Sequence, residues 1–360
     1  MMTLFEQLKS VYNNKRVLIT GDTGFKGSWL CIWLRELGAQ VWGYALPPLT
    51  ERDNFVSTSL HEKITHRNGD IRDLEKLKQY FQEVKPEFTF HLAAQPLVID
   101  SYKDPHYTFE TNVMGTVNFF EAVRSCSSVK VAVNVTTDKC YENNEWVWGY
   151  RESDPMGGKD PYSASKGCSE LVTTSYRHSF FSDKKSTLIA SARAGNVIGG
   201  GDWAANRIMP DIIRSYLNKT ELVIRNPNYV RPWQFVLEPV CGYLELASAL
   251  YKKGKDFEGG WNFGPSSYER YTVNQVVETA KQMLPELKVR AEQPQTEKLH
   301  ESGMLQLDIN KAVNLLGWKP RLDFQQTIDF TVNGYIDELR SPESLYDKRV
   351  RQIREYCGEN

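Results

Sequence analysis

Two residues with the spacing of a proton-transfer pair are the most informative feature of the sequence. Tyr162 and Lys166 stand four residues apart, so on a helix they share one face. A neighbouring ammonium favours the charged form of a phenol, and we expect Lys166 to lower the pKa of Tyr162 from its usual value of about 10. A phenolate near neutral pH can accept a hydroxyl proton while a hydride leaves the same carbon. The pair therefore predicts an enzyme, with an ordinary pair of helix residues as the alternative.

A glycine-rich turn predicts a dinucleotide cofactor as the acceptor of that hydride. Residues 21–27 read G-x-x-G-x-x-G and stand between a predicted strand at 16–20 and a predicted helix at 28–37. Glycine lets a ligand approach the backbone, and amides at the start of a helix can face a pyrophosphate. A tight turn without a ligand is the alternative. The residues predicted to hold the cofactor here are Gly21, Thr23, Gly24, Phe25, Lys26 and Gly27.

Further cofactor contacts are expected on the adenine and ribose side, at Asp70, Ile71, Leu92, Ala93 and Ala94. Asp70 has a second interpretation as the cap of the helix that follows it. We expect NAD, yet the acid that normally holds its ribose hydroxyls at the end of the second strand is replaced by residues 43–46, Gly-Tyr-Ala-Leu. NADP therefore stays open, with Arg52 either contacting a 2′-phosphate or lying in an exposed loop.

Alternating strands and helices predict the fold that positions these residues. Predicted strands lie at residues 16–20, 40–44, 88–92, 129–135 and 188–192, and further predicted helices at 74–84, 104–126 and 161–181. Such alternation is typical of an α/β protein with a Rossmann-type, doubly wound parallel sheet. We expect residues 1–195 to form this dinucleotide-binding domain, with part of 235–265 returning to it. Residues 196–360 should form mainly a smaller, mixed α/β lobe for the substrate, with helices at 238–251 and 273–283.

The composition argues against several classes of partner. The 44 basic and 45 acidic residues leave a net charge of −1, which gives no electrostatic case for nucleic acid or an anionic membrane. The six cysteines include no C-x-x-C pair, which favours reduced thiols and no metal site. The first residues lack a signal-peptide core and no apolar run approaches membrane-spanning length, so we expect a cytoplasmic protein.

Together the motifs resemble the extended short-chain dehydrogenase/reductase family of NAD-dependent epimerases and dehydratases. The resemblance covers most of the chain and rests on the glycine turn, Leu92-Ala93-Ala94, Asn112, Thr137, Tyr162 and Lys166. Longer strings at residues 157–162, 193–203 and 231–236 fit its nucleotide-sugar dehydratases. The resemblance implies an NAD site that includes Thr111, Tyr162 and Lys166. Competing interpretations are a 4-epimerase or another nucleotide-sugar dehydratase, which would use the same residues, and a dinucleotide-sensing protein without catalysis, which would not need them.

The resemblance also implies roles for the residues that follow the strand at 129–135. Tyr162 would accept the proton of the sugar C4 hydroxyl while Thr137 hydrogen-bonds the developing carbonyl oxygen. The C4 ketone acidifies C5, so a base can remove the C5 proton while Asp138 protonates the leaving C6 hydroxyl, and the hydride then returns to C6. Lys139 stands where relatives carry a glutamate base. It is the base, a stabiliser of the enolate, or a structural partner of Asp138.

Lys139 also makes the sequence similar to the CDP-glucose 4,6-dehydratase branch of the family, because the dTDP-glucose branch has an acid there. This similarity implies CDP-glucose as substrate and CDP-4-keto-6-deoxyglucose as product, for deoxysugars of surface polysaccharide such as lipopolysaccharide O-antigen. Substrate contacts are expected at Gln95, Asn196, Asn206, Arg207, Arg231, Trp233 and Glu301. The arginines have an alternative role in stacking on aromatic side chains, and Trp233 has one in closing the contact between the lobes.

An apolar helix face predicts self-association. The face across residues 107–123, together with the helix at 162–180, fits the four-helix contact through which members of the family form homodimers. Packing of the same helices on the sheet inside one subunit is the alternative. Periodicity alone does not separate the two interpretations.

Overall fold

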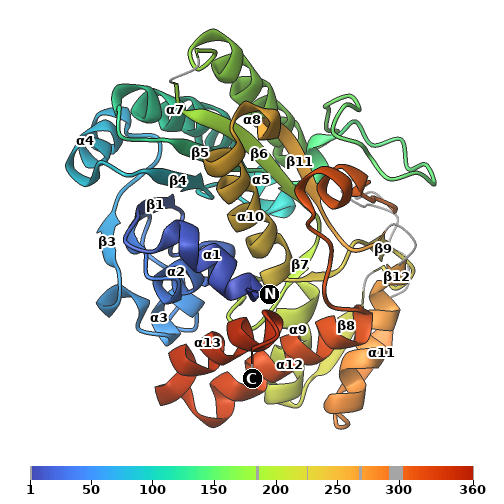
Figure 1. Ribbon diagram of the computed structural model, residues 1–360. Helices are drawn as coiled ribbons and strands as arrows, with labels where there is room; N and C mark the ends of the chain where they lie inside the picture. The colour runs from blue at the N-terminus through green and yellow to red at the C-terminus, as the bar shows by residue number, and fades with distance from the viewer. Residues whose placement is uncertain (1, 184–185, 225, 267–269, 292–302, 360) are drawn as a thin grey trace.

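A parallel sheet of seven strands forms the centre of the larger domain in the computed structural model, which describes residues 2–183, 186–224, 226–266, 270–291 and 303–359 (Figure 1). The strand order is β11-β6-β5-β4-β1-β2-β3, and neighbouring strands are parallel. This doubly wound topology confirms the Rossmann-type α/β prediction. The strands are β1 (Arg16–Thr20), β2 (Gln40–Ala45), β3 (Thr65–Asn68), β4 (Phe88–His91), β5 (Val131–Val135), β6 (Leu188–Ala194) and β11 (Gly259–Phe263).

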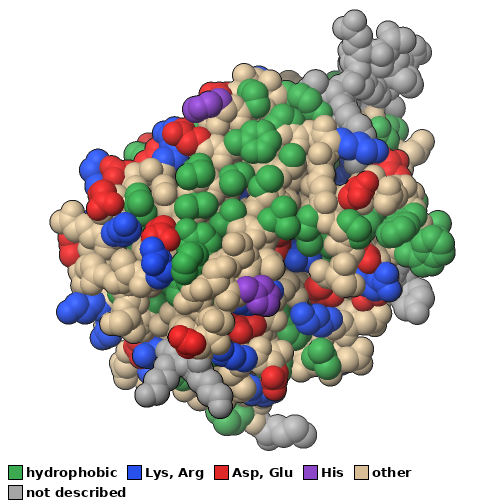
Figure 2. All heavy atoms as spheres, turned by 90° about the horizontal axis from the view of Figure 1, so that it is seen from above, with side chains coloured by type: hydrophobic (Ala, Val, Ile, Leu, Met, Phe, Trp, Pro, Cys, Tyr) green, Lys and Arg blue, Asp and Glu red, His purple; other side chains and the backbone are tan. Residues whose placement is uncertain are grey.

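Helices cover both faces of this sheet, so successive side chains of one strand enter two different cores. Val17 and Ile19 of β1 pack with α1 (Leu4–Tyr12), α2 (Phe25–Glu36) and α10 (Leu237–Lys253). Leu18 between them packs with α4 (Leu74–Val84) and α7 (Gly115–Ser125), and α8 (Pro161–Ser179) lies beside α7. Seen from above, the surface carries apolar side chains across its middle and charged ones toward its margins (Figure 2).

Two edge strands were not predicted from the sequence, and one predicted helix is interrupted. β3 reads Thr-His-Arg-Asn and is mostly exposed, and β11 begins with two glycines, so neither shows the apolar run that marks a strand. The helix predicted at 104–126 consists of α6 (Pro105–Phe109), a π-helical turn η2 (Glu110–Met114) and α7. Such turns are frequent at functional sites, and this one contains Thr111.

A smaller lobe is built around its own apolar core. Ile212, Val276 and Ile328 are fully buried there. Its main elements are α9 (Ile208–Asn218), β8 (Glu221–Ile224), α11 (Val273–Met283), β13 (Lys288–Ala291) and α12 (Phe324–Arg340). Strands β8 and β13 pair in parallel. Between these elements the chain passes back to the larger domain, where α10 packs on β5 and β6, and β11 pairs with β6.

The C-terminal helix α13 (Leu345–Tyr356) lies against α2 of the larger domain. Tyr356 meets Trp33 edge-on with 5.8 Å between ring centroids. Arg349 lies over the ring of Trp29 at 5.1 Å. Figure 1 shows the blue N-terminal helix and the red C-terminal helix near each other. Segments far apart in the sequence therefore tie the two lobes together.

Candidate active site

A cavity of about 650 Å³ lies between the two lobes, a size typical of small-molecule sites. The larger domain lines it with residues after β5 and at the start of α8, and the smaller lobe lines it with α9 and β8. Residues predicted from the sequence that line this cavity are Phe25, Lys26, Thr137, Asp138, Lys139, Tyr162, Asn196, Asn206, Arg207, Arg231 and Trp233. Catalytic candidates other than Lys166, which does not line the cavity, thus meet substrate candidates from the other half of the chain in one place.

Two local caps bring the catalytic candidates into the cavity. After β5 the chain forms a short 3₁₀ helix, η3 (Asp138–Cys140), whose N-cap is Thr137. The Thr137 hydroxyl accepts from the Lys139 amide at 3.3 Å, which fixes the turn. Helix α8 is capped by Asp160 and begins with a proline, whose fixed φ suits the first helical position. Tyr162 therefore lies in the first turn of α8, at the cavity wall.

The pKa of Tyr162 differs from the sequence prediction. Burial raises the pKa of its phenol to about 12, because loss of water destabilises the phenolate, while a hydrogen bond with Thr137 and the charge of Arg207 oppose the shift. Burial also lowers the pKa of Lys166 to about 8. Tyr162 and Lys166 do share the buried side of α8, as their spacing predicted. The expectation of a lowered tyrosine pKa is nevertheless wrong for this structure.

Asp138 is buried in the cavity wall, and burial favours the neutral form of its carboxyl. Only 2% of its surface is exposed, and burial raises the pKa of its carboxyl against the charges of Lys139 and Arg231. Thr137 Oγ1 donates to its Oδ1 at 2.9 Å, whereas its Oδ2 has no hydrogen-bond partner among the described residues. Lys139 is half-buried, and no ion pair joins it to Asp138 in the described part of the chain. The described residues therefore show no ion pair that would support the structural interpretation of Lys139.

Lys26 adds a cation to the cavity from the glycine turn. Its Nζ donates to Tyr243 Oη at 3.4 Å, and the side chain lines the cavity. Burial lowers the pKa of this amine to about 7, with the positive charges of Lys166 and Arg207 acting in the same direction and Asp138 opposing them. The backbone of Lys26 belongs to the glycine turn, whereas its side chain lies in the same cavity as the catalytic candidates.

The glycine turn is packed so closely that side chains would obstruct it. Gly21 has a φ of +81°, and a Cβ atom there would lie 2.6 Å from the backbone nitrogen of Ala93. A Cβ atom at Gly27 would lie 2.0 Å from the Gly21 carbonyl oxygen. Thr23 Oγ1 donates to the carbonyl of Leu46 at 2.9 Å, which holds the turn against the end of β2. The glycine turn therefore lies at the start of α2, in contact with the ends of β1, β2 and β4.

Two other cofactor candidates differ in their surroundings. Asp70 is bound to Arg72 at 2.6 Å, and these hydrogen bonds hold the pKa of its carboxyl below the usual range. The cap of α4 is Asp73, so the interpretation of Asp70 as that cap is wrong. The hydroxyl of Thr111 is buried and has no hydrogen-bond partner among the residues described. A buried polar atom without a protein partner is a typical contact for a ligand.

The substrate candidates beyond residue 195 give the cavity a cationic wall. Arg207 lines it while paired with Asp202 at 2.9 Å. Arg231 is 5% exposed and lies over the ring of Tyr229 at 5.1 Å. It therefore lines the cavity and also stacks on an aromatic side chain. Trp233 donates from its indole to a backbone carbonyl at 3.0 Å, which fixes its ring. The planar donor groups of arginine suit the oxygens of a diphosphate.

Two other residues weighed in the sequence analysis, Gln95 and Arg52, do not line this wall, and a third is outside the described part of the chain. Gln95 is absent from the cavity lining, and its buried amide donates to Thr108 at 2.9 Å, so the substrate role predicted for it is not supported. Glu301 lies outside the described residues. Arg52 lies over the ring of Trp203 at 4.7 Å, which favours its structural interpretation over a contact with a 2′-phosphate.

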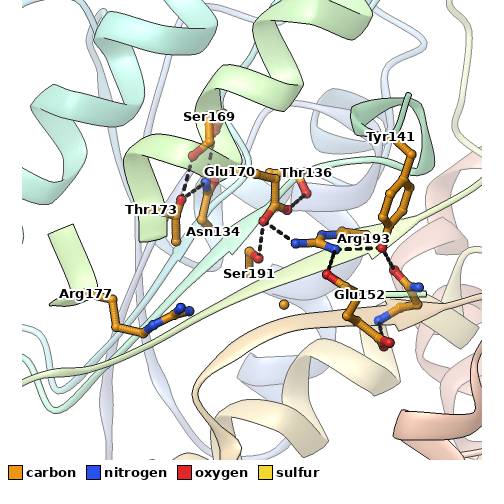
Figure 3. A network of polar contacts seen from close by, with 12 residues as sticks. Asn134, Thr136, Tyr141, Glu152, Ser169, Glu170, Thr173, Arg177, Ser191 and Arg193 are labelled. Carbon is orange, nitrogen blue, oxygen red and sulfur yellow. Dashed lines mark hydrogen bonds and ion pairs between the residues drawn. The ribbon is translucent and has the colours of Figure 1, made fainter. Parts of the chain in front are cut away.

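Two charged residues beside the site were not singled out from the sequence. Glu170 and Arg193 form a buried ion pair at 2.8 Å (Figure 3). Glu170 follows Lys166 by four residues and so continues the face of α8 that carries Tyr162, which is the signal that would have found it. Neither side chain lines the cavity.

The fold and the site define a class of protein. A doubly wound parallel sheet, a glycine turn after its first strand, a threonine after β5 and a Tyr-x-x-x-Lys pair on α8 are the features of short-chain dehydrogenases/reductases. The sequence profile of the GDP-mannose 4,6 dehydratase family matches residues 18–331. The chain belongs to the nucleotide-sugar 4,6-dehydratase family, which confirms the predicted family, enzyme class and type of reaction.

One curated relative agrees with this assignment, and two solved structures share the fold. The CDP-glucose 4,6-dehydratase of Salmonella typhimurium is 47% identical over 97% of this chain and 98% of its own length. The solved structure of a Thermus thermophilus UDP-glucose 4-epimerase in complex with NAD has a TM-score of 0.74 and 26% identity, covering 89% of this chain and 99% of that chain. A double mutant of the Streptomyces venezuelae dTDP-glucose 4,6-dehydratase DesIV has a TM-score of 0.76 and 23% identity, covering 92% and 99%.

Proposed function

We propose that the protein is an NAD-dependent CDP-glucose 4,6-dehydratase. The observation that carries the proposal is the placement of Asp138 and Lys139 in the same cavity as Thr137 and Tyr162. Thr137 and Tyr162 alone would serve a 4-epimerase, whereas an acid and an amine beside them suit loss of water across C5 and C6. The identity of 47% to the Salmonella enzyme supports CDP-glucose as substrate, and the NAD complex of the Thermus epimerase supports NAD.

The residues around the glycine turn fit NAD. At Gly21 and Gly27 there is no room for side chains, which leaves backbone amides to face a pyrophosphate at the start of α2. Among the described residues no side chain caps α2, so its first amides keep their affinity for an anion. The remaining contacts we expect are Asp70, Ile71, Leu92, Ala93, Ala94, Thr111, Tyr162 and Lys166. When bound, NAD supplies the acceptor for the C4 hydride, the donor for C6 and a positive charge that favours the phenolate.

Tyr162 and Thr137 handle the proton at C4. As the phenolate, which the positive charge of bound NAD would favour, Tyr162 takes the proton of the C4 hydroxyl, and the Thr137 hydroxyl donates to the oxygen as it becomes a carbonyl. The charge of Arg207, which lowers the pKa of the phenol against the effect of burial, assists the transfer. Because Tyr162 is 8% exposed, the proton passes to this phenol and not to bulk water.

Asp138 and Lys139 carry out the elimination. The C4 ketone acidifies the hydrogen on C5, and Lys139 removes this proton or stabilises the enolate that forms. Asp138, whose carboxyl pKa is raised by burial, donates its proton to the C6 hydroxyl, which leaves as water. After hydride returns to C6 and a proton to C5, the product is CDP-4-keto-6-deoxyglucose.

We assign the nucleotide to the side of the cavity formed by the smaller lobe. In this division residues 1–195, with part of 235–265, bind the dinucleotide, and 196–360 mainly bind the nucleotide sugar. The diphosphate would meet donors from Asn196, Asn206, Arg207 and Arg231, with Trp233 beside it. Helix α13, packed on α2, is one part of 196–360 that lies against the larger domain, and residues 305–318 are another.

We further propose a homodimer built on α6, α7 and α8. Four apolar side chains on or next to these helices are 38%, 50%, 60% and 51% exposed, namely Phe109, Met114, Leu171 and Phe180. Figure 2, which looks down on the side where Figure 1 places α7 and α8, shows apolar side chains gathered across its middle. Such a surface suits contact with a second copy of the chain. A light-scattering mass equal to one chain at micromolar protein would contradict the dimer.

The cellular role we propose follows from the product. A 4-keto-6-deoxy nucleotide sugar is a precursor of deoxysugars, here for surface polysaccharide such as lipopolysaccharide O-antigen. None of the described helices is long and apolar enough to cross a membrane. The six cysteines are unpaired, and all but Cys168 are buried, which suits reduced thiols and a cytoplasmic enzyme.

Product analysis in deuterated water tests the proposed function. The purified protein is incubated with NAD and CDP-glucose and, in parallel, with dTDP-glucose, UDP-glucose or GDP-mannose, and with NADP in place of NAD. NMR should show a 4-keto-6-deoxy product deuterated at C5, formed from CDP-glucose alone. A C4 epimer that has lost no water would show a 4-epimerase instead. No turnover of any donor would favour a dinucleotide-sensing protein without catalysis.

A further inference from the structure

A buried ion pair that the proposed reaction does not use lies beside the catalytic residues (Figure 3). Glu170 of α8 and Arg193 of β6 approach to 2.8 Å, with 2% and 5% of their side chains exposed. Burial alone would raise the pKa of Glu170, but the charge and hydrogen bonds of Arg193 hold it below the usual range. Burying two charges is costly unless each is well bonded, so the partners of the pair show what it holds in place.

Glu170 fastens the start of the segment 136–141, which carries the catalytic candidates. Its Oε1 accepts from the hydroxyl of Thr136, directly before Thr137, and its Oε2 accepts from Ser191 of β6 at 2.6 Å. The carboxylate therefore connects the end of β5 to β6 and to α8. Since α8 begins with the catalytic tyrosine, this bond fixes the loop relative to the helix.

Arg193 fastens the other end of the same segment. Its Nη1 donates to Tyr141 Oη at 2.6 Å, and its guanidinium lies over the Tyr141 ring at 5.1 Å. Tyr141 Oη donates in turn to Asn262 Oδ1 of β11 at 2.7 Å. The guanidinium fits because β11 has glycine at 260, where a Cβ atom would lie 2.4 Å from Arg193 Nη2.

We propose that Glu170 and Arg193 are positioning residues for the elimination, one ion pair that holds both ends of segment 136–141 against α8. The inference rests on the proposed function, because it concerns the geometry of that site. Tyr162, Lys166 and Glu170 follow one another at intervals of four residues on the buried face of α8, so one helix face carries the catalytic groups and one member of the ion pair. We call the Glu170–Arg193 pair, with its hydrogen bonds to segment 136–141, the clamp. Misplacing a reacting group by about 1 Å can slow a reaction about 100-fold.

Removing the two charges together separates positioning from stability. Glu170→Gln or Arg193→Met alone leaves a buried group unpaired, so we expect a lower Tm and a lower kcat. In the double variant neither charge remains, and we expect Tm to recover in part. Its kcat should stay about 100-fold below wild type while KM for CDP-glucose changes by less than about threefold. Recovery of kcat together with Tm would overturn the inference.

The pH profile gives a readout that a purely structural role would not change. The charge of Glu170 opposes the lowering of the Lys166 pKa by burial. Glu170→Gln should therefore move the limb of the kcat profile that reports Lys166 to lower pH. Glu170→Asp, which keeps the charge, should leave that limb near its wild-type position. An unmoved limb in Glu170→Gln would count against the clamp.

A milder variant tests the clamp even where the charge variants fail to fold. Tyr141→Phe keeps the ring but deletes the hydroxyl that Arg193 holds. We expect faster amide hydrogen exchange in segment 136–141 and slower deuterium incorporation at C5. Glu338→Gln is the matched control for Glu170→Gln, since Glu338 pairs with Arg349 at 3.7 Å in another buried site. This control should lower Tm and leave kcat per folded enzyme unchanged. Wild-type exchange and wild-type kcat in Tyr141→Phe would refute the clamp.

Failure of this inference and failure of the proposed function give different results. Amide exchange needs no substrate, and the wild-type protein provides the reference for turnover. If wild type converts CDP-glucose and the variants match it, only the clamp is wrong. If wild type converts no donor but the variants exchange faster in segment 136–141, the proposed reaction is wrong and the clamp stands.

Discussion

The hydroxyl of Thr137 and the carboxyl of Asp138 are hydrogen-bonded to each other at 2.9 Å within the catalytic cavity. In the proposed reaction Thr137 contacts the C4 oxygen and Asp138 protonates the C6 oxygen. Because the two groups share a hydrogen bond, a change in one alters the direction and proton affinity of the other. Oxidation and elimination are thus linked through the protein, and substitutions at the two positions should not be additive.

Replacing Tyr162 with phenylalanine should prevent oxidation at C4. The ring still fills its place, but no group remains to accept the hydroxyl proton, and we expect kcat to fall by about 10²- to 10⁴-fold. Absorbance of NADH in a single turnover is the measurement, with NAD affinity as the control that should not change. Substantial NADH formation in this variant would contradict the role of Tyr162.

Asp138→Asn should separate the first step from the second. The amide has the shape of the carboxyl and can still accept from Thr137, but it has no proton to give to the C6 hydroxyl. We expect NADH and the 4-keto sugar to accumulate while loss of water slows about 100-fold. Stopped-flow absorbance and NMR of quenched samples would follow the two steps. Equal slowing of both would mean that Asp138 already acts at C4.

Lys139→Ala should slow deuterium exchange at C5 more than it weakens substrate binding. The amine is either the base or the cation that stabilises the enolate, and both act after the substrate is bound. Exchange at C5 measured by NMR, compared with KM for CDP-glucose, gives the answer. Lys103→Ala is the matched control, since Lys103 is exposed and paired with Asp100 at 2.8 Å. A loss of affinity with unchanged chemistry would assign Lys139 to binding or structure.

Substrate affinity should depend on pH through Lys26. With its pKa lowered to about 7, this amine is positive below that pH and neutral above it. The positive form attracts a diphosphate, so KM for CDP-glucose should rise as pH increases from 6 to 8, by about fivefold if the charge contributes on the order of 1 kcal/mol. Lys26→Met should remove the dependence. An identical rise in Lys26→Met would assign it to another group.

Gly21→Ala should abolish NAD binding. The substitution places a methyl group 2.6 Å from the backbone of Ala93 at a φ of +81°, which forces the turn to move. Quenching of protein fluorescence by NAD would measure the affinity. Gly317→Ala is the control, because Gly317 has a φ of +82° in the left-handed helical region with no atom within 4 Å of the added Cβ, and it should cost about 1 kcal/mol of stability without loss of NAD affinity.

The residues of the site were easier to predict than the contacts that set their chemistry. Strands β1 and β5 have apolar runs because both faces are buried, and motif spacing then located the turn, Thr137, Tyr162 and Lys166. Edge strands β3 and β11 lack such runs. Burial of a phenol depends on tertiary packing, so residue spacing could not predict the raised pKa of Tyr162. For the same reason it could not predict the hydrogen bond that the Gln95 amide donates to Thr108.

Helix α13 covers α2, and about 300 residues separate them in the chain. During synthesis at roughly 5 to 20 residues per second, α2 waits on the order of 15 to 60 s before its partner leaves the ribosome. In that interval Trp29 and Trp33 lack the side chains of α13 that later cover them. The two indoles therefore gain this cover only after residues 345–356 have been made, so α13 docks on α2 late in folding.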